Sequence, residues 1–184
     1  MEYQDSELIA EYLKGDTRSL EVLIRRFVKP LYSFIFRFVS STDDAEDIVQ
    51  ETFFKVWKGI KKFKPESNFK TWLFTIAHNT AIDHVRRKKS LAFSSFEDAD
   101  GENIMEEMLS DPEPLPDELF ARAELEAMLE KAVVALAPIY REVLLLYYHE
   151  YLTFEEVSTV LGVSINTIKS RHRRALLELQ KHFG

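Results

Sequence analysis

Cationic, amide and hydroxyl side chains gather in one short stretch near the C-terminus, between Ser164 and Ala175. Arginine can bond bidentately to guanine edges in the major groove of DNA, asparagine can do so to adenine, and lysine suits phosphate. The residues of these types are Asn166, Thr167, Lys169, Ser170, Arg171, Arg173 and Arg174. This combination is the chemistry of a surface that reads duplex DNA.

The surrounding residues predict two helices that would position this surface. Thr153 and Glu156 have the spacing of a capping box, so a first helix begins there and ends at Gly162. Ser164 can cap a second helix. The inward side of that second helix is expected to carry Ile165, Ile168, Ala175, Leu176 and Leu179, with His172 in a packing role. The pattern predicts a helix-turn-helix that turns its polar side to DNA.

A second group of cationic residues is interleaved with aromatic rings between Lys61 and Arg87. Rings can stack on unstacked bases while cations neutralise phosphate, so this interleaving suits melted nucleic acid. We predict a loop from about Lys61 to Phe69 and a helix from about Lys70. The expected contacts are Lys61, Lys62, Phe63, Lys64, Ser67, Asn68 and Phe69 in the loop, with Trp72, Thr75, Asn79, Asp83, Arg86 and Arg87 on the helix.

A third candidate surface lies on a helix that is predicted to begin near Asp43. Its inward side carries Ala45, Ile48, Val49, Thr52, Phe53 and Val56, whereas Asp43, Asp47, Gln50, Glu51 and Phe54 project outward. A phenylalanine among acids and a glutamine favours docking onto a partner that is basic around an apolar notch. The alternative is a solvated acidic helix with Phe54 tucked under a neighbour.

The composition limits the classes of protein that this chain can be. Its 184 residues are 46% hydrophobic, which is enough for one or two small cored domains and too rich for a disordered chain. It has no cysteine, which excludes disulfides and thiolate metal sites, and we expect no cofactor. No secretory signal or long apolar span is present, so a cytoplasmic protein without direct membrane insertion is expected.

The charge changes sign along the chain, although the net charge is −7. A basic block from Lys61 to Lys89 precedes an acidic stretch from Ser94 to Ala121 that contains no lysine or arginine. The prolines at 112, 114 and 116 disfavour helix within that stretch. We therefore predict an acidic linker at 91–116, about thirty residues that average roughly 30 Å and stretch to about 100 Å.

The apolar residues on both sides of this linker recur at helical spacing, which predicts an all-α protein. In the N-terminal domain, 1–90, we expect a helix from Ser6 to Lys14, a second helix capped by Asp16 and a third that starts after Pro30. In the C-terminal domain, 117–184, helices at Asp117–Leu136 and Pro138–Tyr148 would brace the helix-turn-helix. Whether the two domains fold against each other stays open, although the acidic linker would permit a closed form that covers both basic faces.

Nearly the whole chain resembles a sigma factor of bacterial RNA polymerase, of the extracytoplasmic-function type that keeps only the second and fourth sigma domains. The motifs that carry the resemblance are the acidic helix 43–53, the aromatic run 69–79 and the end of the helix-turn-helix, 167–175. The resemblance implies a non-enzymatic protein that binds core polymerase, directs it to promoters and helps to melt them. It also implies that the chain lacks catalytic residues and resident metals.

The resemblance assigns a partner to each surface. The acidic helix with Asp43, Asp47, Gln50, Glu51 and Phe54 would grip the clamp helices of the beta-prime subunit, with further contact to the beta subunit. The loop and helix at 61–87 would read the −10 element and hold a flipped base. The helix-turn-helix would read the −35 element, and Thr153 joins its expected contacts. Position 173 is arginine where many relatives carry an aromatic or other bulky residue, so the −35 sequence cannot be borrowed from them.

The resemblance also suggests how the chain is regulated. Members are usually held inactive by an anti-sigma factor, which at a membrane would tether the chain indirectly. We further hypothesise that the acids between Glu97 and Glu118 mimic nucleic acid in the polymerase channel.

Two other functions stay open on the residues alone. The first is a stand-alone regulator that dimerises through its N-terminal helices and uses only the helix-turn-helix on DNA. The second is a metal enzyme built on His78, Asp83 and His84 or on the acids at 43–47. His78 and His84 are six residues apart, so on one helix they point away from each other and make poor co-ligands.

Overall fold

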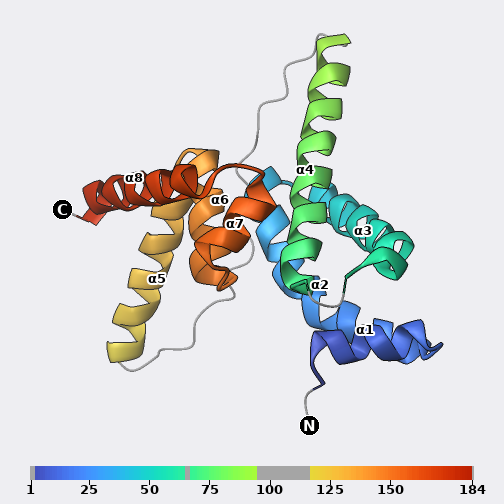
Figure 1. The fold of residues 1–184 in the computed structure, drawn as a ribbon. Coiled ribbons are helices and arrows are strands. Elements are labelled where there is room, and N and C mark those ends of the chain that lie inside the picture. Colours follow the sequence, from blue (N-terminus) through green and yellow to red (C-terminus); the bar gives the residue numbers. More distant parts are fainter. Residues whose placement is uncertain (1–2, 65–66, 95–116, 184) are drawn as a thin grey trace.

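The computed structural model of the chain describes residues 3–64, 67–94 and 117–183, which form helices joined by turns (Figure 1). No strand occurs within these ranges, so the prediction of an all-α fold is confirmed. None of the helices in the described ranges is both long and apolar enough to cross a membrane. Positions 91–94 of the predicted linker belong to a helix, and the rest of the linker lies outside the described residues. Most of the acids between Glu97 and Glu118, which we hypothesise to mimic nucleic acid, also lie outside them.

The N-terminal domain consists of four helices around a common apolar core. They are α1 (Asp5–Leu13), α2 (Thr17–Val39), α3 (Thr42–Gly59) and α4 (Phe69–Ser94), with a short 3-10 turn, η1 (Ile60–Lys62), after α3. Asp16 caps α2 by accepting a hydrogen bond from the backbone N–H of Arg18 at 3.1 Å, as predicted. Ser41 caps α3 in the same way through the N–H of Asp44.

Helix α2 continues through Pro30, so the prediction of a new helix at that residue is wrong. A proline inside a helix removes one backbone hydrogen bond and disfavours the preceding turn. The buried residues of α2 nevertheless form one uninterrupted stripe across it: Leu20, Leu23, Phe27, Leu31, Phe34 and Ile35. Burial of this stripe against α1, α3 and α4 outweighs the local cost of the proline.

The C-terminal domain contains α5 (Asp117–Ala135), α6 (Pro138–Leu144), α7 (Phe154–Leu161) and α8 (Ile165–Phe183). A π-helical turn, η2 (Leu145–His149), extends α6. The predicted capping box is present, because Thr153 and Glu156 exchange hydrogen bonds with each other's backbone N–H groups. Gly162 ends α7 at a φ of 64°, a left-handed conformation that glycine adopts without steric cost. Helices α7 and α8 therefore form the predicted helix-turn-helix.

Helix α8 packs through fewer apolar residues than its sequence predicts. Ile168, Ala175 and Leu179 are buried, but Leu176 is 41% exposed and borders an open groove, so its predicted inward position is wrong. His172 contributes to the packing instead. Its ring stacks on Tyr148 at 5.6 Å, and its Nε2 lies 3.1 Å from the Tyr148 hydroxyl. Tyr147 and Phe154 meet the same imidazole edge-on.

The two domains are packed against each other, with α7 lying beside α4 (Figure 1). One continuous group of buried side chains runs from the N-terminal domain into α6, η2, α7 and the start of α8. A second, smaller group joins α5, α6 and the later part of α8. The sequence alone did not decide whether the two domains pack against each other. In it the polar side of α8 remains exposed, so the closed form does not cover both basic faces.

We expect the stability of the C-terminal domain to fall as the pH falls below 7, because burial lowers the pKa of His172 from its usual 6.5. A histidine whose folded pKa is lowered is protonated first in the unfolded chain, so unfolding becomes easier as pH drops through about 6.5. Thermal unfolding between pH 7.5 and pH 5 measures the effect. The difference between wild type and His172→Gln should grow smaller toward low pH; a constant difference would contradict the assignment.

Candidate nucleic-acid interface

The polar side of α8 is presented to solvent as the sequence predicts. Asn166, Lys169, Ser170, Arg173 and Arg174 are exposed, whereas Thr167 and Arg171 are half-buried. The hydroxyl of Ser164 accepts a hydrogen bond from the backbone N–H of Thr167 at 3.2 Å, which fixes the first turn of the helix. The exposed N-terminal half of a helix, rich in arginine and amide groups, has the form required to enter a major groove.

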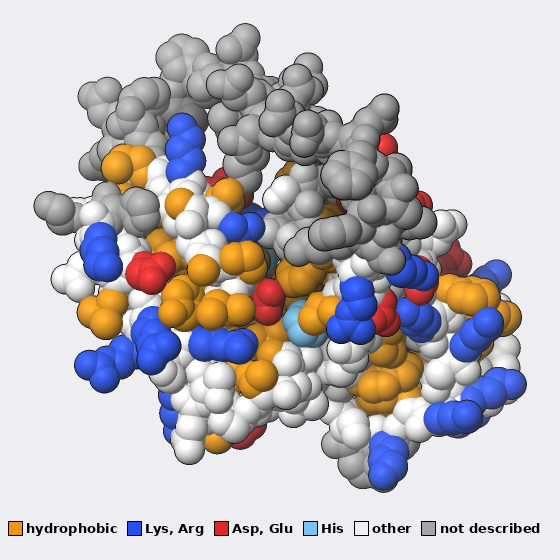
Figure 2. Space-filling model, turned by 90° about the horizontal axis from the view of Figure 1, so that it is seen from above, with side chains coloured by type: hydrophobic (Ala, Val, Ile, Leu, Met, Phe, Trp, Pro, Cys, Tyr) orange, Lys and Arg blue, Asp and Glu red, His pale blue; other side chains and the backbone are white. Residues whose placement is uncertain are grey.

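A hollow of about 500 Å³ lies between the start of α6 and the exposed side of α8. Ile139 and Tyr140 form one wall, and Asn166, Ser170 and Arg174 are among the residues that form the other. Seen from above, Lys and Arg side chains stand along both flanks of the molecule, with hydrophobic side chains between them (Figure 2). Arg171 and Arg174 line the hollow itself, so a phosphate group near it would meet positive charge.

The second predicted surface separates into exposed cations and a buried aromatic support. Lys61, Lys62 and Lys64 are exposed, and so are Ser67 and Asn68. Phe63 and Phe69 are buried, which contradicts the prediction that their rings contact bases. Both rings pack on half-buried Trp72, at 5.1 and 5.8 Å between ring centroids. Burial of the two rings removes apolar area from water, and this stabilises the attachment of the basic loop to α4.

The open side of α4 carries Asn79, Asp83 and Arg86 at successive turns, and all three are exposed. Thr75 is half-buried and donates a hydrogen bond from its hydroxyl to the Thr71 carbonyl at 2.7 Å. Arg87 lies at 3.1 Å from a carboxylate oxygen of Glu51, so this predicted DNA contact is bound to α3 in the described arrangement. Asn79 and Arg86 are therefore exposed polar groups on α4 that a strand of nucleic acid could reach.

The third predicted surface is an exposed acidic and aromatic face on α3. Asp43, Asp47, Gln50 and Phe54 are exposed and Glu51 is half-buried, so Phe54 is not tucked under a neighbour. Sequence reasoning missed Trp57, which is 53% exposed and lies 6.0 Å from Phe54 between ring centroids. Its position three residues after Phe54 places it on the same helical face and was the available signal.

Two acids at the edge of this face are held ionised by neighbouring cations. Hydrogen bonding from Lys55, with a further contribution from Arg87, lowers the pKa of Glu51 despite its partial burial. Burial opposes ionisation of Asp44, but hydrogen bonds from Lys88 and His84 outweigh it and lower the pKa of that carboxyl. The contacts of Arg87, Lys88 and His84 connect α3 to α4. Asp43 and Asp47 are exposed and make no ion pair among the described residues, so their carboxylates are accessible to a partner.

The histidines that a metal enzyme would require are separated. His78 is buried between the domains, where its Nε2 lies 3.5 Å from a carboxylate oxygen of Glu142. His84 pairs instead with Asp44 at 3.1 Å. Among the residues that the structure describes, no three His, Cys, Asp or Glu side chains are grouped closely enough to hold a metal ion.

Comparison with known proteins matches both halves of the chain to one family. Residues 23–91 match the family description "Sigma-70 region 2", and residues 132–181 match "Sigma-70, region 4". The RNA polymerase sigma-H factor of Pseudomonas aeruginosa is 30% identical over 184 residues, which cover 97% of this chain and 93% of that protein. The ECF RNA polymerase sigma factor SigW of Bacillus subtilis is 29% identical, covering 98% of this chain and 97% of that protein.

Solved structures agree with this assignment. The sigma factor RpoE of Bartonella quintana, in complex with the anti-sigma factor NepR, aligns with a TM-score of 0.70 at 26% identity, over 91% of this chain and 98% of that one. CnrH, in complex with the cytosolic domain of CnrY, aligns with a TM-score of 0.66 at 26% identity, over 96% of this chain and 95% of that one. The chain therefore belongs to the extracytoplasmic-function sigma factors, the subunits that direct bacterial RNA polymerase to promoters.

Proposed function

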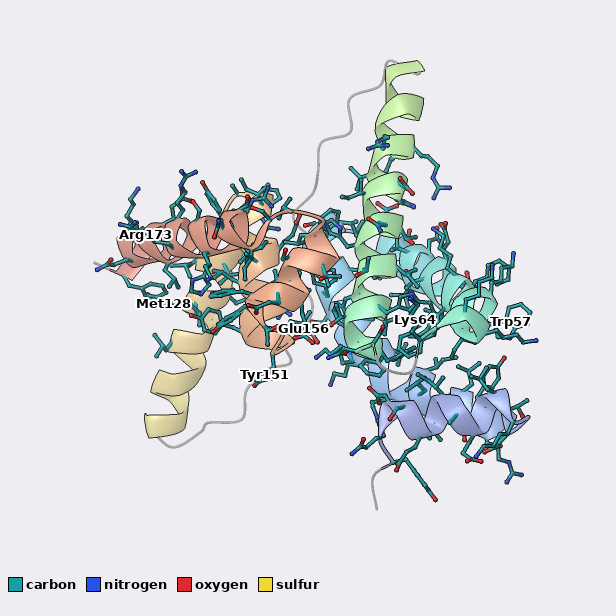
Figure 3. The ribbon with its side chains drawn as sticks, in the orientation of Figure 1. Trp57, Lys64, Met128, Tyr151, Glu156 and Arg173 are labelled. Carbon is teal, nitrogen blue, oxygen red and sulfur yellow. The ribbon has the colours of Figure 1, made fainter. Side chains whose placement is uncertain are left out.

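We propose that the three exposed faces carry out the separate tasks of a sigma factor: α3 docks on core polymerase, the basic loop with α4 opens the −10 element, and α8 reads the −35 element. The observation that carries this proposal is their placement on one fold. Trp57 on α3 and Arg173 on α8 lie on opposite sides of the molecule (Figure 3). A partner bound at one of these faces therefore leaves the other accessible.

Promoter opening on the α4 face would work by differential binding. Unstacking a base costs a few kcal/mol, and contacts that exist only with the extruded base offset that cost. Asn79 can hydrogen-bond a base edge, while Lys61, Lys62 and Arg86 can neutralise the phosphates beside it. The chain makes no bond itself in this mechanism, because phosphodiester synthesis belongs to the polymerase, and we class it as a non-enzyme.

An inhibitory protein partner would suit a groove in the C-terminal domain. The groove holds about 640 Å³ between α5, α6, η2 and α8, with Arg37 of α2 also in its lining. Its apolar lining includes Leu129, Val133, Leu144 and Leu176. Two similar proteins are seen with protein partners: RpoE with the anti-sigma factor NepR, and CnrH with the cytosolic domain of CnrY. We propose that an anti-sigma factor uses an amphipathic helix to cover this groove, since an apolar stripe on a helix matches such a lining.

Removal of both exposed rings of α3 should weaken the binding of core polymerase. Phe54→Ala/Trp57→Ala is expected to raise the Kd for core polymerase by about thirtyfold or more, because aromatic anchors at interfaces contribute about 2 kcal/mol or more. Val28→Ala, which trims an exposed apolar side chain on α2, is the control and should bind as wild type does. Equal affinity of the double variant and the control would remove α3 as the docking face.

Substitutions on α8 should separate sequence reading from phosphate binding. Arg173→Ala is expected to cost about 1–3 kcal/mol on preferred promoters and to relax base preference within the −35 element. Lys169→Ala should weaken binding to all sequences alike and reduce the salt slope by about one. Sequencing of promoters selected by each holoenzyme, together with salt titrations, measures both effects. An unchanged base preference in Arg173→Ala would exclude this residue from readout.

Asn79→Ala should impair promoter melting without loss of docking. We expect about a tenfold lower yield of open complex at saturating holoenzyme. The substitution removes a base contact that exists only in the open complex, so it destabilises that state alone. Permanganate reactivity of unpaired thymines measures melting, and capture of core polymerase by the same variant is the control. Normal melting by Asn79→Ala would place the base pocket elsewhere on the N-terminal domain.

A further inference from the structure

The contact between the domains uses polar side chains that adjoin the proposed −10 surface. Lys70 donates to the backbone carbonyl of Glu150 at 2.7 Å and forms an ion pair with its carboxylate at 2.8 Å. The Glu150 side chain is only 3% exposed, so it relies on this cation and on its neighbour His149. A buried carboxylate loses its solvation and depends strongly on the partners that remain.

A second set of contacts lies further along the chain, in the first turn of α7. The carboxylate of Glu156 accepts hydrogen bonds from the Asn68 amide at 2.6 Å and from the Thr71 hydroxyl at 3.2 Å. Figure 3 shows Glu156 on the side of α7 that faces α4. Asn68 also caps α4 by accepting from the backbone N–H of Thr71. The start of the helix that carries the proposed −10 surface is therefore tied to the helix-turn-helix.

This packing holds the two DNA surfaces too close together for a promoter. The −10 and −35 elements are about 25 base pairs apart, which is roughly 85 Å at about 3.4 Å per pair. Helix α4 touches α7, and α8 follows α7 after three residues. Helices pack about 8–10 Å apart and rise about 1.5 Å per residue, so the two surfaces lie within about 40 Å of each other.

We propose that the described arrangement is a closed state of the free chain. Apolar side chains buried between the domains contribute to it, and it is held by an interdomain latch that consists of Asn68, Lys70 and Thr71 on one side and Glu150 and Glu156 on the other. This inference rests on the proposed function, because it uses the assignment of the two DNA surfaces. The latch must separate before one chain can engage both promoter elements. Its strength therefore sets the fraction of free chain that is ready to initiate, while the docking face on α3 stays accessible throughout.

Energy transfer between two dyes tests the latch in the free chain without any polymerase. The native sequence has no cysteine, so dyes can be placed at Glu46→Cys on α3 and Gln180→Cys on α8, both exposed positions. Wild type should show mainly high transfer. Glu150→Gln should raise the low-transfer population about tenfold, the effect of losing a hydrogen bond between charged groups. Glu155→Gln, an exposed neighbour on α7, is the matched control and should leave the distribution unchanged.

The two readouts distinguish failure of the latch from failure of the proposed function. Equal distributions for Glu150→Gln and Glu155→Gln would overturn the latch even if the chain binds core polymerase normally. Failure of the wild-type chain to bind core polymerase would instead contradict the proposed function, while the dye measurement would still report whether the latch holds the two domains together.

A reversible cross-link tests the consequence for initiation. Asn68→Cys/Glu156→Cys bridged by a disulfide-containing bis-maleimide should still bind core polymerase but give no open complex. Reduction of the bridge should restore opening to the level of the unbridged variant. Open complexes formed equally well with the bridge intact would overturn the proposal.

Discussion

Helix α4 packs on two sides at once, and the positions of all three proposed interfaces depend on it. Its apolar side, which includes Leu73, Phe74 and Ala77, is buried against α2 and α3 and fixes the docking helix. Its N-terminal edge contacts α7 and so positions the helix-turn-helix. Because one rigid helix makes both sets of contacts, a change in how α4 meets α7 moves α8 relative to α3 and exposes apolar side chains that are buried between the domains.

The recognition helix remains available to DNA because little of its surface is needed for packing. Ile168 and Ala175 enter the core, and the imidazole of His172 fills the space between them against aromatic rings. The apolar stripe of α8 is therefore narrow, and the rest of its circumference can carry polar groups. Because this stripe is narrow, Leu176 lies at the rim of a groove, where a partner protein could complete the burial of its side chain.

The charge pattern of the sequence overstates how many cations are free. Within the basic block, Lys70, Arg87 and Lys88 are paired with Glu150, Glu51 and Asp44. The lysines of the loop and Arg86 are exposed, and these cations can meet phosphate. Separation of the domains would release Lys70 as well, so the open state presents more positive charge to DNA than the closed one. A net charge of −7 is compatible with DNA binding because the accessible cations are clustered.

The sequence by itself predicted the features that depend on residues three or four positions apart. The capping box at Thr153, the stop at Gly162, the polar side of α8 and the outward position of Phe54 all depend on local spacing, and each is present as predicted. Tertiary structure alone decided the continuity of α2 through Pro30, the burial of Phe63 and Phe69, and the meeting of Lys70 with Glu150. These features depend on which helices lie beside each other. Contacts between residues distant in sequence bury apolar area and pair charged groups that have lost water, and these contributions to the free energy exceed the local preferences of the chain.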